Sequence, residues 1–253
     1  MLTSIVITKN EAEMIRDCLL SLKFSDEIIV VDTGNSDKTN VIAQHYKARI
    51  IKSSGSDYSK FRNDGLTAAS GDWVLYIDAD ERVTPLLRKE ISETIATSSL
   101  VSAYALLRQN LYLGREMHFG GWGGDYVIRL FQKPKLKHWQ NPLHEEPVIE
   151  GELGKLIHPL VHISHRDLSS MLDKTLNFTK YEAQLRLNAN HPLMVPWRFV
   201  RVMASEFWLR FIQLSAWRDG VEGVIDGMFQ VFNSFVIYAR LWEMQIDAKS
   251  RHS

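Results

Sequence analysis

The strongest constraint on the fold is a series of short apolar strands that alternate with helical patterns. Residues 3–8 and 27–32 are rich in β-branched and other apolar side chains, and Ile15, Cys18 and Leu22 between them have helical spacing. Such a strand–helix–strand unit is typical of two parallel strands joined by a crossover helix. The chain therefore begins with an open α/β sheet.

The same alternation continues to about residue 100. Helical patterns over 41–46 and 59–69 flank a third strand at 48–52, and the fourth strand, WVLYI at 73–77, is almost entirely apolar. A strand of this composition is typical of a parallel sheet that is covered on both faces.

Beyond residue 100 the pattern changes to short strands, expected at 102–107, 126–132 and 161–164, and then to helices from about residue 168. We predict one α/β domain over residues 1–167, with halves at 1–100 and 101–167, and a helical extension over 168–253.

One segment of the extension is strongly amphipathic. Its apolar residues recur at three- and four-residue steps: Trp197, Val200, Ala204, Phe207, Trp208, Phe211 and Leu214. Its polar residues fall on the other side: Arg198, Arg201, Glu206, Arg210 and Gln213. Such a helix either lies in a membrane interface or packs on the α/β domain or on a second subunit.

A second segment, 224–242, has apolar steps of four and three, the spacing of a seam that packs on another helix. Neither segment is an uninterrupted apolar run of about 20 residues, so we expect no membrane-spanning helix.

The charge balance and the cysteine content limit which ligands and which cellular compartment are expected. Thirty basic and thirty acidic residues cancel, so no overall field would attract nucleic acid, and an anionic ligand must be held by local groups. The single cysteine suits a reducing cytoplasm.

The opening MLTSIVITKNEAE becomes polar after a short apolar run, so we expect neither signal peptide nor spanning helix there. We expect a cytoplasmic protein, either free or peripheral on the inner face of the cytoplasmic membrane.

Polar side chains follow the predicted parallel strands, where ligands of open α/β sheets bind. They are Thr8, Asn10 and Glu11 after the first strand, Asp32 after the second, and Asp78 and Asp80 after the fourth. No G-x-G-x-x-G follows the first strand and no G-x-x-x-x-G-K-[ST] occurs, so phosphate must be held in another way.

The segment Asp78-Ala79-Asp80 places two carboxylates two residues apart on a chain leaving the sheet. Such a pair can share Mg²⁺ or Mn²⁺, whose remaining positions are taken by water and substrate phosphates. The cation would neutralise charge on a departing diphosphate. Taken alone, the tripeptide equally fits an ordinary charged turn.

Four segments together resemble the family 2 glycosyltransferases in order and spacing. They are IVITKNE at 5–11, EIIVVDTGNSD at 27–37, Arg62-Asn63-x-Gly65, and GDWxLxIDADE at 71–81. The resemblance covers roughly residues 3–90. It implies a GT-A fold, a nucleoside-diphosphate sugar as donor, with UDP favoured, inversion at the anomeric carbon, and a divalent cation at the Asp-x-Asp element.

The resemblance also suggests individual roles. Thr8, Asn10 and Glu11 would form the nucleoside-binding end, together with Asp32 as the carboxylate on base or ribose, and Arg62 and Asn63 would border the nucleotide. Some of these polar residues could instead cap helices. Thr8-x-x-Glu11 has capping-box spacing, and Ser36 or Asp37 suits the N-cap of the next helix.

Later segments resemble the subgroup that contains lipopolysaccharide core glucosyltransferases and related envelope-glycan enzymes. They are Gly114, Gly120-Gly121-Trp122, Asp125, Arg129-Leu130-Phe131 and Leu143-His144-Glu145. This likeness implies that 101–167 binds the acceptor, a saccharide or a lipid-linked glycan, through Trp122, Arg129 and His144. Trp122, surrounded by four glycines, could otherwise be a packed anchor.

Inverting displacement needs one carboxylate to take the proton of the acceptor hydroxyl. Glu145 is the first choice for this base, Asp125 the second and Glu146 the third. The alternative is that Glu145 caps a surface turn after Pro142.

Three histidines, His158, His162 and His165, crowd one stretch, and His165 is the one we expect to complete a metal shell with Asp78 and Asp80. The alternative is a buried, hydrogen-bonded histidine. Zinc is not expected, because the chain has no cysteine pair and no H-E-x-x-H.

Two other functions share some of these features. A haloacid-dehalogenase-type phosphohydrolase also uses Asp-x-Asp after a strand, but its nucleophile ends the first strand, which here ends in Thr-Lys-Asn-Glu. A non-catalytic sugar- or membrane-binding relative would not need Asp78, Asp80 and Glu145.

Overall fold

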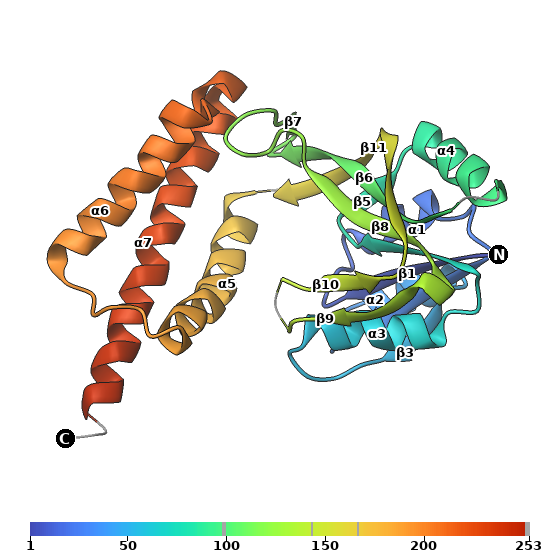
Figure 1. Ribbon diagram of the computed structural model, residues 1–253, viewed down its shortest axis with the longest axis horizontal. Helices are drawn as coiled ribbons and strands as arrows, with labels where there is room; N and C mark the ends of the chain where they lie inside the picture. Colours follow the sequence, from blue (N-terminus) through green and yellow to red (C-terminus); the bar gives the residue numbers. More distant parts are fainter. Residues whose placement is uncertain (98–99, 143, 166, 251–253) are drawn as a thin grey trace. The chain divides into compact units, whose positions relative to one another are not determined.

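The computed structural model describes residues 1–97, 100–142, 144–165 and 167–250. The chain forms two compact units (Figure 1). The first comprises Met1–Gln109 and Gly124–His162, and the second comprises Asn110–Gly123 and Ile163–Ser253.

Four parallel strands form one half of the main sheet, in the order β3-β2-β1-β4. They are β1 (Leu2–Thr8), β2 (Glu27–Asp32), β3 (Arg49–Lys52) and β4 (Trp73–Asp78). The register pairs Thr8 with Asp32, and Ile7 with Asp78. The carboxyl ends of β1, β2 and β4 therefore coincide at one edge of the sheet.

The other half of the sheet continues from β4 through antiparallel strands, in the order β8-β6-β11-β5. They are β5 (Glu81–Val83), β6 (Val101–Tyr112), β8 (Tyr126–Gln132) and β11 (Glu152–His165), and the short β7 (Arg115–Glu116) pairs with β6. Strands β9 (Leu136–Gln140) and β10 (Glu146–Ile149) form a separate hairpin after the 3₁₀ turn η1 (Lys133–Lys135).

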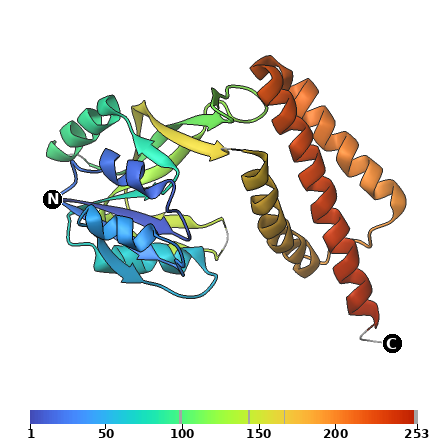
Figure 2. The ribbon, with the colours of Figure 1, turned by 180° about the vertical axis from the view of Figure 1, so that it is seen from behind.

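Helices cover both faces of the parallel strands (Figures 1 and 2). One buried cluster joins the sheet to α1 (Ile15–Ser21), α2 (Thr39–His45) and α4 (Pro85–Ala96). The opposite cluster joins it to α3 (Tyr58–Ala68) and to Trp139 of β9. Val6 lies in the first cluster and Ile5 in the second, as the two-residue period of a strand requires. The strands therefore need apolar residues on both sides.

Gly65 allows α3 to lie directly on the sheet. A Cβ at this position would be 2.6 Å from Ile5 Cγ2 and 3.3 Å from Val31 Cγ2. The missing side chain fixes how closely α3, with Arg62 and Asn63, approaches β1.

Gly65→Ala is expected to lower the free energy of unfolding by about 1 kcal/mol. Alanine favours a helix by about 1 kcal/mol over glycine, but overpacking a core costs about 1–3 kcal/mol. Urea unfolding would measure the change. Ile5→Ala removes the closest methyl group, so the double variant should lose less stability than the sum of the two single losses. A Gly65→Ala chain more stable than the parent would contradict the tight contact.

The predicted strands and helices of the first hundred residues are confirmed, with ends shifted by one or two residues. The strand predicted at 102–107 is longer, Val101–Tyr112, and the one predicted at 161–164 is the end of the 14-residue β11. The short strands β5, β9 and β10 had no sequence signal of their own.

The two predicted helix caps differ from the structure. Helix α1 begins at Ile15, so Thr8 and Glu11 form no capping box, and the Glu11 N–H donates to Thr39 Oγ1 (2.8 Å). The N-cap of α2 is Lys38, one residue beyond the predicted positions. Asp37 nevertheless accepts from the Thr39 N–H (2.9 Å) and the Ala12 N–H (3.0 Å), and so joins the two loops.

The second unit contains the predicted helices: α5 (Leu168–Asn188), α6 (Pro196–Phe207) and α7 (Gly220–Ser250). A π-helical turn η2 (Trp208–Gln213) and a 3₁₀ turn η3 (Ala216–Asp219) join α6 to α7. Helix α7 packs against both α5 and α6. Among the helices of the described residues, none combines the length and apolar character needed to cross a membrane.

Residues 110–123 belong to the second unit because their polar groups bind its helices. The backbone N–H groups of His118 and Phe119 donate to Asp219 Oδ2 (2.9 and 2.7 Å). Trp122 Nε1 donates to Asp226 Oδ2 (2.7 Å).

Candidate active site

The carboxyl edge of the parallel sheet gathers most of the polar residues predicted for the first unit. Thr8, Asp32 and Asp78 end adjacent strands, so residues far apart in the sequence lie side by side there. This edge is where an open α/β sheet binds its ligands.

The loops after β1 and β2 are fastened to each other. The Asn10 N–H donates to Asn35 Oδ1 (2.7 Å), and the Ser36 N–H donates to Asn10 Oδ1 (2.8 Å). Asn35 Nδ2 also donates to Thr8 Oγ1 (2.8 Å). Asn10 has φ 59°, a left-handed conformation that asparagine tolerates better than most residues. The predicted nucleoside-binding residues Thr8 and Asn10 therefore belong to one ordered loop pair.

Asp32 orders the second of these loops. Its Oδ1 accepts from the backbone N–H groups of Gly34 (2.9 Å) and Asn35 (2.7 Å), and its Oδ2 accepts from Asn40 Nδ2 (2.7 Å). Burial alone would raise the pKa of Asp32, but the hydrogen bonds from Asn35, Asn40 and Gly34 lower it below its usual value. In this structure its carboxylate shapes the loop at which a nucleoside is expected.

Asp32→Asn is expected to cost about 1.5–3 kcal/mol of unfolding free energy at pH 7, because a buried hydrogen-bonded charge is lost and an amide faces Asn40. A lowered carboxyl pKa gives stability that is present above about pH 4 and is lost as the pH falls through the lowered pKa. The difference should therefore shrink at pH 3.5. Urea unfolding at both pH values tests this, with the exposed Asp17→Asn as control, and equal losses at both would contradict it.

Asp78, at the end of β4, is held between two arginines. Arg129 Nη2 binds its Oδ2, and Arg62 Nη2 lies 3.7 Å from its Oδ1. Burial alone would raise the pKa of Asp78, but Arg129 and Arg62 bring it well below its usual value. Asp78 is therefore ionised at neutral pH, and both of its oxygens face a positive charge.

Arg62 connects Asp78 to Glu145, the predicted base. Its Nε and Nη2 both lie 2.7 Å from Glu145 Oε1. The guanidinium is nearly buried, with its carbon 4.7 Å from the centre of the Trp139 ring. The structure thus brings Arg62, Asp78 and Glu145 together, and the turn-capping alternative does not account for the Arg62 contact.

Helix α3 holds the segment that carries Glu145 at two further points. Asn63 Nδ2 donates to the Trp139 carbonyl (2.9 Å), and the Trp139 N–H donates to Asn63 Oδ1 (2.8 Å). The Tyr58 N–H donates to the Pro142 carbonyl (3.1 Å). Asn63, predicted to border the nucleotide, in this structure joins α3 to β9 by two hydrogen bonds.

Beside Asp78 lies a buried ion cluster that continues to Asp125, the second candidate base. Glu81 is fully buried, 2.8 Å from Arg129 Nη2 and 3.8 Å from Arg108 Nη1. Arg108 binds Asp125 Oδ2 through Nη2 (2.6 Å) and Nε (2.8 Å). Burial, together with the Asp78 carboxylate and against the pull of Arg129, raises the pKa of Glu81. Arg129, predicted to face the acceptor, is instead a buried partner of two carboxylates.

Asp80 lies beside His162. His162 stands opposite Glu81 in the β5–β11 pairing, and its Nε2 is 3.7 Å from Asp80 Oδ2. The favoured histidine, His165, belongs to the second unit, where its ring packs edge-on against Tyr112 (5.4 Å between centres). The histidine that the structure brings to the Asp-x-Asp element is therefore His162.

The donor set suits a divalent cation held by few protein ligands. Within the described ranges, no group of three or more His, Cys, Asp or Glu side chains is arranged to hold a metal ion. Asp80 and His162 supply one carboxylate and one imidazole, and Mn²⁺ or Mg²⁺ commonly takes its other ligands from water and phosphate. Asp78 binds arginines instead, so the residues fit a cation on Asp80 and His162.

The remaining predicted residues are placed as follows. Ala79 is buried and His144 is exposed with φ 56°. Glu11 contributes its backbone N–H to the loop pair. Trp122 is half-buried in the second unit, hydrogen-bonded to Asp226, which is the behaviour of a packed anchor. Acceptor contact by Trp122 and His144 stays a prediction.

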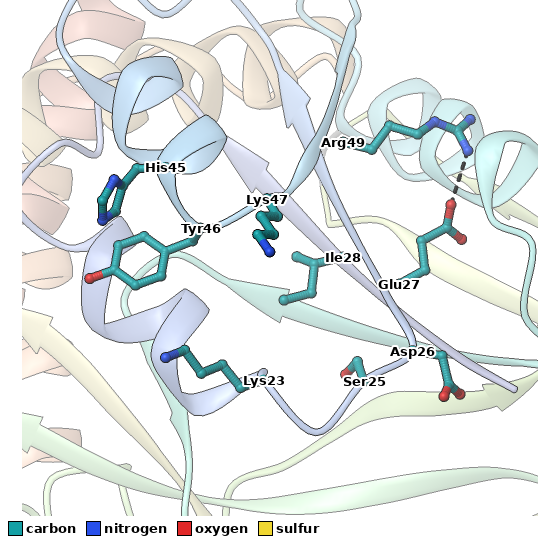
Figure 3. A pocket seen from close by; sticks show the side chains of 9 residues that line it. All are labelled: Lys23, Ser25, Asp26, Glu27, Ile28, His45, Tyr46, Lys47 and Arg49. Atoms are coloured by element: carbon teal, nitrogen blue, oxygen red, sulfur yellow. Dashed lines mark hydrogen bonds and ion pairs between the residues drawn. The ribbon is translucent and has the colours of Figure 1, made fainter.

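A cavity of about 580 Å³ lies at the opposite edge of the sheet. Figure 3 shows its lining around the amino ends of β2 and β3, where Arg49 pairs with Glu27 (2.9 Å) and Tyr46 lies near Lys23. None of its lining residues belongs to the cluster around Asp78, so the cavity is separate from the candidate active site.

The chain is similar to known proteins over part or nearly all of its length. Residues 3–117 match the family model described as glycosyl transferase family 2. An uncharacterized glycosyltransferase of Rickettsia bellii is 35% identical over 261 residues, which are 97% of this chain and 87% of that protein. The lipopolysaccharide core biosynthesis glycosyltransferase LpsC of Rhizobium meliloti is 24% identical over 96% of this chain and 92% of its own.

Other similarities are shorter or more distant. A TPR repeat-containing protein of Synechococcus elongatus is 32% identical over 142 residues, 55% of this chain, and this chain spans only 34% of it. Among solved structures, residues 1–349 of S. aureus TarS have a TM-score of 0.47 at 14% identity, covering 92% of this chain and 80% of that one. Glucosyl-3-phosphoglycerate synthase of Mycobacterium tuberculosis with Mn²⁺ and UDP has a TM-score of 0.42 at 18% identity, covering 54% and 58%.

Proposed function

The chain belongs to glycosyl transferase family 2, and we propose that it moves a hexose from a UDP-hexose donor to a saccharide or lipid-linked acceptor of the cell envelope. The single observation that carries the proposal is the chain of contacts from Asp78 through Arg62 to Glu145. In the proposed mechanism, it would join the site of the departing diphosphate to the carboxylate that takes the proton. The name of the LpsC relative supports an envelope-glycan acceptor.

The donor would extend along the carboxyl edge of the sheet. Its nucleoside would lie at the loop pair of Thr8, Asn10 and Asp32, and its diphosphate beside Asp78 and Asp80. Arg62 and Arg129 already compensate the charge of Asp78, so Asp78 would add little repulsion to an incoming diphosphate. No G-x-G-x-x-G or P-loop is required for this arrangement.

Asp80 and His162 are the residues that would hold Mn²⁺ or Mg²⁺. When bound there, the cation would neutralise charge on the departing diphosphate. Within the proposal, His162 takes the place that the sequence suggested for His165.

Glu145 would act as the general base. As the acceptor oxygen bonds to the anomeric carbon, the bond from that carbon to the diphosphate breaks, and the hydroxyl proton passes to Glu145. The hydrogen bond from Arg62 Nε and the ion-pair contact of Arg62 Nη2 both end on Oε1, so we assign the proton to Oε2. Attack opposite the leaving group gives inversion, and no covalent enzyme intermediate is needed.

The proposal is tested by thermal stabilisation of the purified chain with UDP, GDP, CDP and dTDP, each with and without Mn²⁺, followed by a nucleotide-sugar hydrolysis assay. We expect stabilisation by UDP with Mn²⁺, and slow hydrolysis of one UDP-hexose. If no nucleoside diphosphate changes the unfolding temperature under any condition, the transferase proposal fails.

Two matched histidine variants test which side chain binds the metal. His162→Asn is expected to weaken Mn²⁺ binding, measured by electron paramagnetic resonance of the free ion, roughly tenfold or more. His165→Asn, three residues along the chain, should leave it unchanged. The reverse result would return the ligand role to His165.

A further inference from the structure

Helix α6 presents an apolar face that the described residues of its unit leave exposed. None of its residues is buried, although it packs along α7 (Figures 1 and 2). Trp197 is 57% exposed, Val200 64% and Trp208 58%, and Ile212 of η2 is 53% exposed. Isolated exposed apolar residues are ordinary, but two tryptophans and two aliphatic side chains in one series are not.

These residues form one stripe. Trp197, Val200, Ala204 and Trp208 follow steps of three and four, so they project from the same side of the helix. The opposite side makes the contacts with the unit. Phe199 packs on Phe235 of α7, with 6.0 Å between ring centres.

Charged groups, too, lie on the packed side of α6. Glu206 binds Arg210 (2.7 Å), and Arg210 Nη1 donates to the Gly120 carbonyl (2.7 Å). The stripe of Trp197, Val200, Ala204 and Trp208 is therefore exposed. Phe211, from the same sequence pattern, lies instead against Gly227 of α7, and Arg210 is turned inward.

The segment that carries the stripe has a net positive charge. Residues 196–219 contain four arginines and two acids. One acid, Glu206, is paired with Arg210, and the other, Asp219, is buried and binds backbone N–H groups. Arg201 is exposed beside the stripe, with its guanidinium carbon 5.5 Å from the Trp197 ring centre. Tryptophan with arginine and without an exposed acid is the composition of a helix that lies in a lipid interface.

We propose that the face of α6 and η2 formed by Trp197, Val200, Ala204, Trp208 and Ile212 docks in the plane of an anionic bilayer. The apolar side chains enter the boundary between headgroups and acyl chains, and Arg201 meets lipid phosphate. A second copy of the chain suits this face less well, because a twofold contact would bring the same positive stripe onto itself, and residues 196–219 offer no exposed acid to pair with it. The proposal is independent of the transfer reaction, since it concerns only the second unit.

The test is sedimentation of the full chain with vesicles of 30% phosphatidylglycerol in phosphatidylcholine, and with phosphatidylcholine alone. We expect binding to the anionic vesicles that weakens with salt. The double variant Trp197→Ser/Trp208→Ser should reduce the partition coefficient roughly tenfold or more. Arg201→Ala should reduce it roughly fivefold, as expected for one basic residue near an anionic surface.

A matched control replaces two exposed apolar residues of the first unit, Val41→Ser/Leu86→Ser, and should bind like the parent chain. Circular dichroism would check that each variant is folded, which is expected because all the changed side chains are exposed. The proposal would be overturned by no binding of the parent chain, by equal binding to both vesicle types, or by unchanged binding of the tryptophan variant. A dimer in light scattering that the tryptophan variant alone dissociates would also overturn it, by assigning the face to a second copy.

Discussion

Glu145→Gln is expected to lower kcat for sugar transfer by about 10²- to 10⁴-fold, the usual contribution of a general base. The glutamine keeps an oxygen that can accept from Arg62, so the contact that positions the side chain survives while the basic group is lost. The affinity for the nucleoside diphosphate should therefore change little. Steady-state rates with a fixed UDP-hexose, alongside calorimetric titration with UDP, separate the two effects.

Two neighbouring carboxylates serve as controls for this prediction. Glu146 is exposed and follows directly in the sequence, so Glu146→Gln should retain nearly all activity. Asp125 is paired with Arg108 by two short contacts and is the competing candidate. Loss of transfer in Asp125→Asn, with transfer intact in Glu145→Gln, would move the role of base to Asp125.

Arg129→Met is expected to cost about 3–5 kcal/mol of unfolding free energy at pH 8, the usual result of breaking a buried ion pair from one side. Arg129 is 6% exposed and is the shared partner of Asp78 and Glu81. Methionine fills much of the volume but leaves two neighbouring carboxylates without their common cation. Equilibrium unfolding in urea would measure the loss.

The loss in Arg129→Met should depend on pH in a definite direction. Burial already raises the pKa of Glu81, and removing the arginine would raise it further and would also bring the pKa of Asp78 up from its lowered value in the folded state. A carboxyl group with a raised folded pKa destabilises the fold increasingly as the pH rises through that pKa. The variant should therefore lose less stability at pH 5 than at pH 8. A loss that is the same at both would show that packing, and not charge, is the main contribution of Arg129.

Much of the α/β half could be predicted from the sequence because its signals are local. Strands β1 to β4 are short apolar runs between helical patterns, and their carboxyl ends follow from the parallel order. The later strands were predicted less well. Strand β5 has three residues and pairs with β11 almost 80 positions away, so no local pattern marks it.

The site residues, too, could be predicted where the signal is local and were missed where it depends on long-range pairing. Asp78, Arg62 and Glu145 were named from motif spacing, and the structure joins them through one guanidinium. Glu81 was overlooked as a partner, although it directly follows the Asp-x-Asp element, and Arg108 carried no signal at all. His162 and His165 could not be separated from sequence, because only the β5–β11 register brings His162 to Asp80.

Helix α3 is attached at three points to the segment around Glu145, and these attachments limit which parts of this enzyme can vary independently. Trp139, Pro142 and Glu145 are each fixed to α3, and α3 is itself seated on β1 through Gly65. The turn between β9 and β10 is thus fastened on both sides of the positions that remain exposed, such as Asn141 and His144. In the proposed mechanism, substitutions at those exposed positions would alter which acceptor is admitted without shifting Glu145, the proposed base, so acceptor choice and reaction geometry would evolve separately.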